Sequence, residues 1–246
     1  MHTILSIGAS TRTYSLCLSP NAKWFHWLRG AGGTSPQDEG VTRIDGKITA
    51  TSPYQDGDST VGRWDKDSLV WMSLIRRTDT SGGDLISHRS FRAKTKRTFK
   101  LASKEFNDLY VEFLGRTNNG QGLFSGIDTI HNVRTTLHIF STDIERDHAP
   151  MYHSTLPMPS GFQIQEAILS HQGSFLICLI GKVQNTKQGR RVTYEIWQYD
   201  LQLTYPKRLY RTTTTNRYLG HLALTPSDRL VSFTHEYKLY TVPTLP

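Results

Sequence analysis

Three carboxylates on strand-like runs of the sequence could carry acid–base chemistry. Asp108 and Glu112 lie in NDLYVEFL, and Glu166 lies in IQEAIL. Two carboxyl groups about 5 to 9.5 Å apart can cleave a glycosidic bond, one as the acid and the other as nucleophile or base. Such a pair must face a common channel, and the alternative is that Glu112 and Glu166 form salt bridges with Arg63. These residues do not decide whether the protein is an enzyme, and we favour a protein without catalytic residues.

Other polar clusters lack the spacing that metal and cofactor sites need. The acidic run STDIERDH at 141–148 has neither the glycine nor the closing glutamate of a calcium loop. His148 and His153 lack the spacing of a zinc protease and have no cysteine nearby. The stretch GAGGTSP at 30–36 lacks the lysine of a phosphate-binding loop. We therefore predict no metal and no cofactor.

The net charge and the cysteine content indicate which partners and which cellular compartment to expect. The formal net charge is +8, so nucleic acid, an anionic membrane or an acidic protein could be attracted to the surface. Cys17 and Cys178 both lie in apolar runs, and the absence of a disulfide framework predicts an intracellular protein, cytoplasmic or nuclear. No run reaches the roughly 18 apolar residues that cross a bilayer, so we expect no membrane partner.

A basic stretch, RSFRAKTKRTFK at 89–100, could bind nucleic acid. Phe91 and Phe99 alternate with its cations and could stack on bases. The alternative is an outer hairpin whose lysines resist edge-to-edge pairing. The candidate basic patch consists of Arg89, Arg92, Lys94, Lys96, Arg97 and Lys100.

The elements that would position these residues repeat along the chain. At 167–180, AILSHQGSFLICLI is an apolar run, a turn and a longer apolar run, as in a hairpin. Similar hairpins occupy 14–28, 60–75, 109–130 and 221–233, with turns that begin near Ser19, Asp65, Arg116, Ser170 and Thr225. The gaps between these turns are about 46, 51, 54 and 55 residues, a period typical of propeller blades.

This repeat predicts an all-β fold, a β-propeller of five four-stranded blades in a single domain over residues 1–246. The blades are expected at approximately 12–55, 59–102, 107–157, 162–214, and 218–243 plus 2–8. Because the last unit lacks an outer strand, we expect the N-terminal strand HTILSIG to complete it and close the ring, which removes exposed sheet edges. A many-stranded β-sandwich and a fragment of a larger propeller are the alternatives.

Several segments resemble the WD40-like propellers. EIWQYDL at 195–201 is similar to the third strand of their blades, and LALTPSDRLVSF and LCLSPNAKWFHW are similar to the hairpin of their first two strands. LHIFSTD and KLYTVP look like degenerate copies of the third strand. The Gly-His dipeptide occurs once, at Gly220-His221, and no unit carries the full His, Asp, Ser and Trp set. The resemblance implies a rigid disc that binds proteins through its loops without catalysis.

In a propeller, the loops between blades and those between second and third strands share one face. The candidate interaction surface on this face is Arg12, Arg76, Arg77, Arg134, Arg190, Arg191 and Arg217. We expect this face to receive a protein partner through an acidic peptide, a phosphoprotein or a nucleic-acid backbone. The predicted function is a non-catalytic protein-binding scaffold. The alternatives are a five-bladed sugar-binding or glycoside-hydrolase-like propeller and a basic nucleic-acid-binding propeller.

Overall fold

The computed structural model describes most of the chain in separate segments. They are residues 11–19, 21–31, 38–45, 49–53, 62–64, 70–75, 85–91, 95–100, 109–128, 137–143, 151–156, 158–187, 189–201, 206–215, 219–236 and 238–245. The described residues form strands, turns and loops and contain no helix, which confirms the predicted all-β class.

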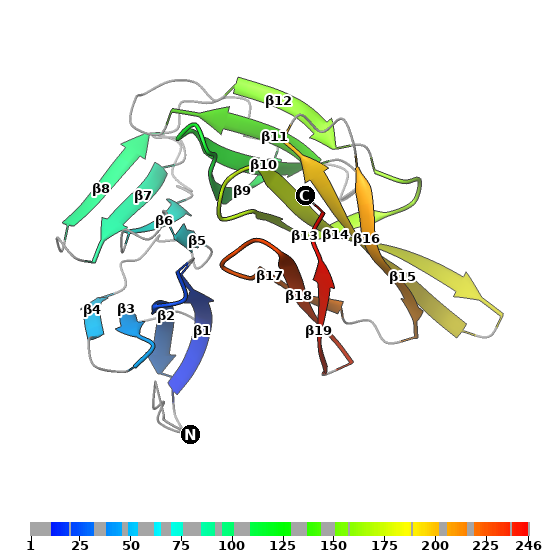
Figure 1. The fold of residues 1–246 in the computed structure, drawn as a ribbon, viewed down its shortest axis with the longest axis horizontal. Helices are drawn as coiled ribbons and strands as arrows, with labels where there is room; N and C mark the ends of the chain where they lie inside the picture. Colours follow the sequence, from blue (N-terminus) through cyan, green and yellow to red (C-terminus); the bar gives the residue numbers. More distant parts are fainter. Residues whose placement is uncertain are drawn as a thin grey trace. The chain divides into compact units, whose positions relative to one another are not determined.

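The strands follow one another at short intervals along the chain (Figure 1). They are β1 (Thr11–Leu18), β2 (Trp24–Ala31), β3 (Asp38–Arg43), β4 (Thr49–Pro53), β5 (Gly62–Trp64), β6 (Val70–Ile75), β7 (Leu85–Ser90), β8 (Thr95–Lys100), β9 (Leu109–Arg116), β10 (Gly122–Asp128), β11 (Leu137–Thr142), β12 (Met151–Leu156), β13 (Gln163–Leu169), β14 (Phe175–Thr186), β15 (Gly189–Asp200), β16 (Lys207–Thr214), β17 (Leu219–Leu224), β18 (Leu230–His235) and β19 (Lys238–Pro243).

Each sheet is an antiparallel meander of consecutive strands. The sheets are β1–β4, β5–β8, β9–β12, β13–β16 and β17–β19. Their limits agree with the blades predicted from the sequence, and neighbours in the chain pair because short connections favour hairpins.

The prediction of five four-stranded blades closed by the first residues is confirmed only in part. The described residues form four four-stranded sheets and one three-stranded sheet, and no described strand joins the first sheet to the last. The strand predicted to complete the fifth sheet falls on residues 2–8, outside the described residues. The chain divides into two compact units, Met1–Ala102 with Asp143–Ala149 and Ser103–Thr142 with Pro150–Pro246, so a single domain stays a prediction.

The hairpin turns repeat in their hydrogen bonds as well as in their sequence. In each turn, the carbonyl of the first residue accepts a bond from the N–H three residues later. The first residues are Ser19, Thr117, Ser170 and Thr225, and the residues three positions later, Ala22, Gly120, Gly173 and Asp228, have φ angles of 55°, 85°, 70° and 58°. Four of the five predicted turns are thus confirmed, and the one near Asp65 lies outside the described residues.

The first half of strand β14 is buried on both faces, which explains its continuous apolar sequence FLICLI. Leu176, Cys178 and Ile180 share one hydrophobic cluster with residues of β9, β10, β11, β12 and β13. Ile177 and Leu179 point the other way and share a second cluster with residues of β17 and β18. Alternate side chains of one strand therefore pack against two different sheets, as in strands that are covered on both faces.

The unit that begins the chain has an aromatic core. Trp64 of β5 donates a hydrogen bond of 3.1 Å from Nε1 to the carbonyl of Cys17 in β1, which ties sheet β5–β8 to sheet β1–β4. The ring of His26 lies between Trp64 and Phe91, with centroid distances of 6.2 and 5.8 Å. His26 is fully buried and its Nε2 lies 3.4 Å from Oε2 of Glu39.

Candidate functional site

The carboxylates that the sequence offers for catalysis have different surroundings in the structure. Glu166 of β13 accepts a hydrogen bond of 3.1 Å from the backbone N–H of Leu222, at the bulge of β17 where His221 has a φ of 58°. Its carboxylate therefore holds two neighbouring sheets together. Glu112 lies half-buried in β9. Asp108 and the side chain of Arg63 lie outside the described residues.

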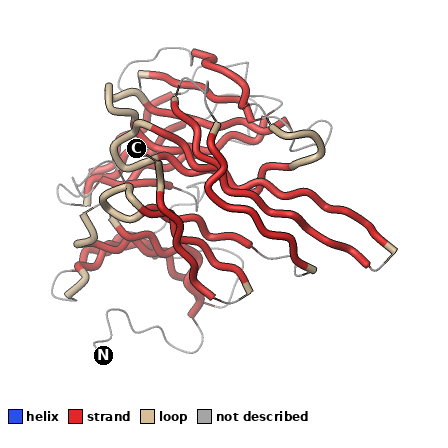
Figure 2. The backbone as a smooth tube through the Cα atoms, turned by 45° about the vertical axis from the view of Figure 1, so that its right-hand side comes forward, coloured by secondary structure: helices blue, strands red, loops and turns tan. Residues whose placement is uncertain are grey.

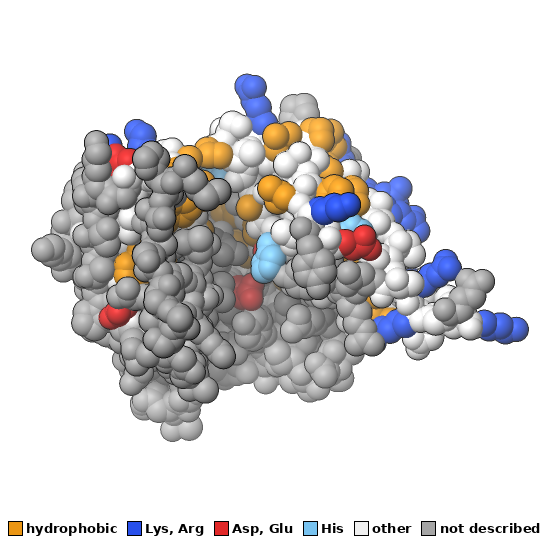
Figure 3. Space-filling view, turned by 90° about the horizontal axis from the view of Figure 1, so that it is seen from below, with side chains coloured by type: hydrophobic (Ala, Val, Ile, Leu, Met, Phe, Trp, Pro, Cys, Tyr) orange, Lys and Arg blue, Asp and Glu red, His pale blue; other side chains and the backbone are white. Residues whose placement is uncertain are grey.

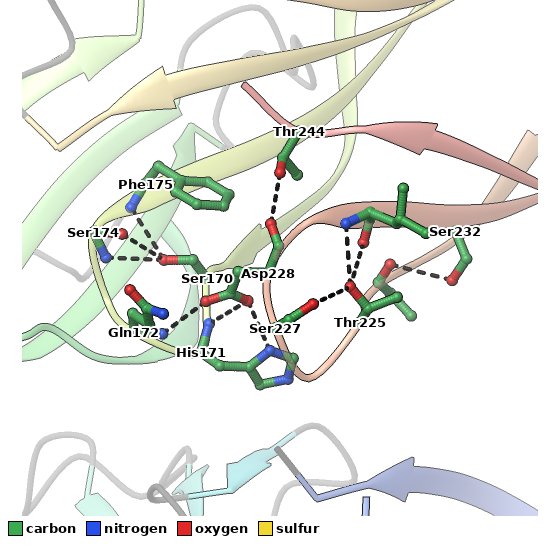
Figure 4. A network of polar contacts seen from close by, with 12 residues as sticks. Ser170, His171, Gln172, Ser174, Phe175, Thr225, Ser227, Asp228, Ser232 and Thr244 are labelled. Carbon is green, nitrogen blue, oxygen red and sulfur yellow. Dashed lines mark hydrogen bonds and ion pairs between the residues drawn. The ribbon is translucent and has the colours of Figure 1, made fainter. Parts of the chain in front are cut away.

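A second carboxylate, Asp228, connects two hairpin turns (Figure 4). Its Oδ1 accepts a bond of 2.9 Å from the backbone N–H of His171, and its Oδ2 accepts one of 2.9 Å from the N–H of Gln172. The Nδ1 of His171 lies 2.8 Å from Oδ1. Burial alone would raise the pKa of this carboxyl, but the bonds from His171 and Gln172 outweigh it and hold the pKa below its ordinary value.

A buried aspartate beside a histidine also occurs in hydrolases, where the histidine activates a nucleophile. The hydroxyls near His171 make other bonds in the part of the chain that the structure describes. Ser170 Oγ accepts bonds from the N–H groups of Ser174 and Phe175, at 2.9 and 3.1 Å. Figure 4 shows these hydroxyls engaged within their own turns. The Asp228 cluster, meaning Asp228, His171 and Gln172, therefore joins turns and does not form a triad.

A groove of about 880 Å³ lies beside the Asp228 cluster. One wall is fixed by Gln198, whose side-chain amide donates to the carbonyl of Leu245 and accepts from its N–H, both at 2.9 Å. Thr244 bonds the carbonyls of Asp228 and Arg229. The groove also holds Lys207 and Arg229. It lies where sheet β13–β16 meets sheet β17–β19.

Among the residues whose side chains the structure describes, several exposed cations lie together on sheet β13–β16. β13 pairs with β14 only as far as Gly181, and β16 pairs with β15 only as far as Val192. Residues 182–187 and 189–191 consequently project beyond the sheet as a two-stranded ribbon (Figure 2). We call these residues the β14–β15 ribbon.

The β14–β15 ribbon is basic along its length. Its sequence, KVQNTKQGRR, contains four cations and no acidic residue. Lys187, Arg190 and Arg191 are exposed, and so is 46% of Val183. Lys182, at the base, donates to the carbonyl of Ser160 at 3.1 Å. Figure 3 shows Lys and Arg side chains gathered on this projection.

The outer strand β16 adds further cations beside the ribbon. Arg208 and Arg211, whose side chains are 46% and 56% exposed, each place one guanidinium nitrogen 3.4 Å from Oε1 of Glu195. Glu195 lies in β15, is 4% exposed and also accepts a bond of 2.8 Å from Nε1 of Trp197. The buried carboxylate therefore fixes two arginine side chains at the surface of the sheet.

The structure places the predicted cations in different settings. Arg190 and Arg191 lie in β15 and Arg12 lies in β1, so the prediction that these three are loop residues is wrong. Each strand continues further than its apolar residues indicate. Outside the described residues are Arg76, Arg77, Arg134, Arg217, Arg92 and Lys94. The remaining members of the basic patch are placed by their backbone, Arg89 in β7 and Lys96, Arg97 and Lys100 in β8.

Another acidic residue, Glu39, is buried in the first compact unit. It lies in β3, is 4% exposed and pairs with buried His26. Sequence reasoning missed the roles of Asp228 and Glu195 altogether. A signal for Asp228 exists, because Asp occupies the turn position at which Gly120 and Gly173 stand in the other hairpins.

The described residues contain neither a cluster of metal ligands nor a membrane-spanning helix. No group of three or more His, Cys, Asp or Glu side chains there could hold a metal ion. The described part of the chain also has no helix with the length and hydropathy that crossing a membrane requires.

Comparison of the sequence with protein-family models and with curated proteins gave no match. Solved structures are similar at low identity. One from the mitotic checkpoint complex has a TM-score of 0.57 and 15% identity over 99% of this chain and 78% of its own. A putative TolB from Agrobacterium tumefaciens has a TM-score of 0.53 and 15% identity over 90% of this chain and 69% of its own.

An oligogalacturonate lyase in complex with manganese has a TM-score of 0.53 and 8% identity, and covers 96% of this chain and 90% of its own. These likenesses concern the fold alone. They show that the chain has an all-β, β-propeller-like fold and is similar to propellers of the WD40 and TolB kinds.

Proposed function

We propose that this protein is a non-catalytic β-propeller that binds an acidic protein partner on sheet β13–β16. The observation that carries the proposal is the β14–β15 ribbon, which projects beyond its sheet and exposes Lys187, Arg190 and Arg191 without an acidic residue among them. A surface of one charge raises the rate of encounter with an oppositely charged partner and disfavours partners of like charge.

The carboxylates of the site support a role without catalysis. Glu166 and Asp228 bond backbone N–H groups of neighbouring sheets, and Glu195 binds two arginines. A glycoside hydrolase needs carboxyl groups that are free to exchange protons with a substrate. Carboxylates already committed to backbone donors and guanidinium groups serve instead to hold the fold.

The comparisons support a protein partner, and the cysteines support an intracellular location. A structure similar to this chain belongs to the mitotic checkpoint complex, so a protein of this fold takes part in a multi-protein assembly. Neither Cys17 nor Cys178 forms a disulfide, which supports the proposed setting in the reducing interior of a cell, in the cytoplasm or the nucleus. Burial raises the pKa of the Cys178 thiol to about 12, so this cysteine acts as a core residue.

The test compares acidic, nucleic-acid and sugar probes on the full chain. A fluorescent polyglutamate peptide should bind, and its affinity should fall at least about tenfold in K187E/R190E/R191E, because each charge-assisted contact contributes about 1.5–3 kcal/mol. K23E, which changes one exposed lysine in the other compact unit, is the control and should bind like wild type.

Two other results would overturn the proposal. Tighter binding of a DNA duplex than of polyglutamate at equal ionic strength would favour the nucleic-acid alternative, since such binding falls steeply with salt. Release of reducing sugar from a polysaccharide, lost in E112Q or E166Q, would favour the glycoside-hydrolase alternative.

A further inference from the structure

The outer edge of β16 is a candidate binding edge for an extended peptide. We infer that an acidic segment of the partner pairs with β16 as an additional strand and places its carboxylates over Arg208 and Arg211. The inference rests on the proposed function and names the binding mode. An added strand obtains affinity from main-chain hydrogen bonds and specificity from alternate side chains.

The edge itself supports this mode. β16 is the last strand of its sheet, and no strand in the described residues pairs with its far side (Figure 1). It has 8 residues, whereas the outer strands β4, β8, β12 and β19 have 5, 6, 6 and 6. An edge strand presents a row of backbone donors and acceptors that another extended chain can satisfy.

The cations lie on one face of this edge. Arg211 is opposite Glu195 and Arg208 is opposite Trp197 in the register of β15 and β16. Side chains at alternate positions of a strand share a face, so Arg191 of β15 lies on the same face as Glu195, further along the strand. Arg208 and Arg211 are three positions apart and share this face because the register of β16 shifts between Tyr210 and Arg208, so acidic side chains at every second position meet both when the added strand follows the same shift.

Glu195 prepares the two arginines for such a contact. Arg208 approaches Glu195 through Nη1 and Arg211 through Nε, so each guanidinium has further N–H groups, and about half of each side chain is exposed. Because their positions are fixed by a buried carboxylate, less side-chain entropy is lost when a ligand carboxylate binds. One buried negative charge against two positive charges leaves this pair net positive.

The opposite face of β16 would contact a different kind of side chain on the added strand. Tyr210 is half-buried and packs on Phe233 with ring centroids 4.8 Å apart, and Thr212 is half-buried two residues further along the strand. Apolar or hydroxyl side chains fit beside these residues. The two faces together predict a ligand in which acidic and apolar residues alternate, with the period of two that a strand imposes.

The positive charge of the β16 edge determines which kind of chain can pair with it. A second copy of β16 would bring Lys207, Arg208 and Arg211 opposite like charges, which destabilises cross-strand pairs. An acidic segment has the complementary charge. The occupant is therefore a different protein and not a second copy of this chain.

The probe is a fluorescein-labelled peptide of five Asp-Val repeats with blocked ends, followed by fluorescence anisotropy. We expect R208Q/R211Q to weaken its binding about tenfold or more, since two charge-assisted contacts are lost. Arg191 lies four positions from Glu195 along β15, whereas Arg211 is directly opposite it, so R191Q should weaken binding less. K23Q is the matched control and should bind like wild type. Unchanged affinity in both arginine variants would overturn the inference.

Two further peptides, N-methylated at the odd or at the even positions, separate strand pairing from simple charge attraction. An added strand uses one of its edges, so one peptide should lose binding about tenfold and the other should keep it. Equal affinity of both would overturn strand addition and leave the proposed function intact. Failure of all acidic peptides, polyglutamate included, to bind would overturn both.

Discussion

Two hairpin turns contact the turn before them through the same residue position but by different chemistry. In the β13–β14 turn this residue is Gly173, where an added Cβ would lie 2.5 Å from the carbonyl oxygen of Arg116. In the β17–β18 turn it is Asp228, whose carboxylate bonds His171 and Gln172. Both residues have a positive φ, 70° and 58°.

The difference shows how one backbone turn serves two kinds of contact between sheets. At Gly173 the two turns approach so closely that the N–H of Asn118 bonds the glycine carbonyl at 3.3 Å, and no side chain fits. At Asp228 the turns stand further apart and a buried carboxylate fills the space. The first contact depends on steric fit, whereas the second depends on charge and hydrogen bonds.

The largest effect is expected from Gly173→Ala. The methyl group would overlap backbone atoms of Arg116 and Thr117 at 2.5–2.6 Å, and alanine is strained at a φ of 70°. Strain and overpacking together should lower the free energy of unfolding by about 3 kcal/mol or more. Urea unfolding followed by tryptophan fluorescence measures this change.

Gly120→Ala is the matched control for steric fit. Gly120 occupies the same turn position with a φ of 85°, but no atom lies within 4 Å of an added Cβ. Only the backbone strain of about 1–2 kcal/mol should remain. An equal loss in the two variants would mean that the close approach at Gly173 contributes nothing.

Asp228→Ala is expected to have the next largest effect. It removes the acceptor of two backbone N–H groups and of the His171 ring, all partly or fully buried. Loss of charge-assisted bonds should lower the free energy of unfolding by about 2–3 kcal/mol. Asp228→Gly should cost less than Asp228→Ala, because glycine relieves the strain at a φ of 58°. A change below about 0.5 kcal/mol in both would show that the cluster does not stabilise the fold.

The sequence could predict the hairpins because their signals are local. The turn residues after Ser170 and Thr225 are typical of tight turns, and the run FLICLI of β14 is apolar throughout because both of its faces are buried. The regular spacing of such pairs predicted an all-β, propeller-like fold, whereas the strand expected at 2–8 lies outside the described residues.

The contacts between turns and the length of the ribbon could not be predicted in the same way. Asp228 bonds residues more than fifty positions earlier in the chain, and an aspartate in a turn is ordinary by composition. The sequence KVQNTKQGRR at 182–191 has Val183 as its one apolar side chain, so the alternation that marks a half-buried strand is missing. Arg190 and Arg191 therefore looked like loop residues although they lie in β15.

Gln198→Ala tests the hydrogen bonds at the other side of the Asp228 cluster. The variant removes the two hydrogen bonds of 2.9 Å between the Gln198 amide and Leu245, and should lower the free energy of unfolding by about 1–2 kcal/mol. Gln172→Ala is the matched control, since Gln172 contributes its backbone N–H to Asp228 and its side chain is exposed. A loss as large in Gln172→Ala would contradict the assigned roles.

The smallest effect is the dependence of the Asp228 contact on pH, because protonation weakens the carboxylate as an acceptor without removing it. The pKa of Asp228 in the folded protein lies below its ordinary value of 3.8, so the carboxylate stabilises the fold fully above that value and loses this contribution as the pH falls through the folded pKa. The free energy of unfolding of wild type should therefore approach that of Asp228→Asn only as the pH falls below about 4. Gly173→Ala removes no titratable group, so its difference from wild type should stay constant over the same range. A constant difference for Asp228→Asn as well would mean that both contacts depend on shape alone.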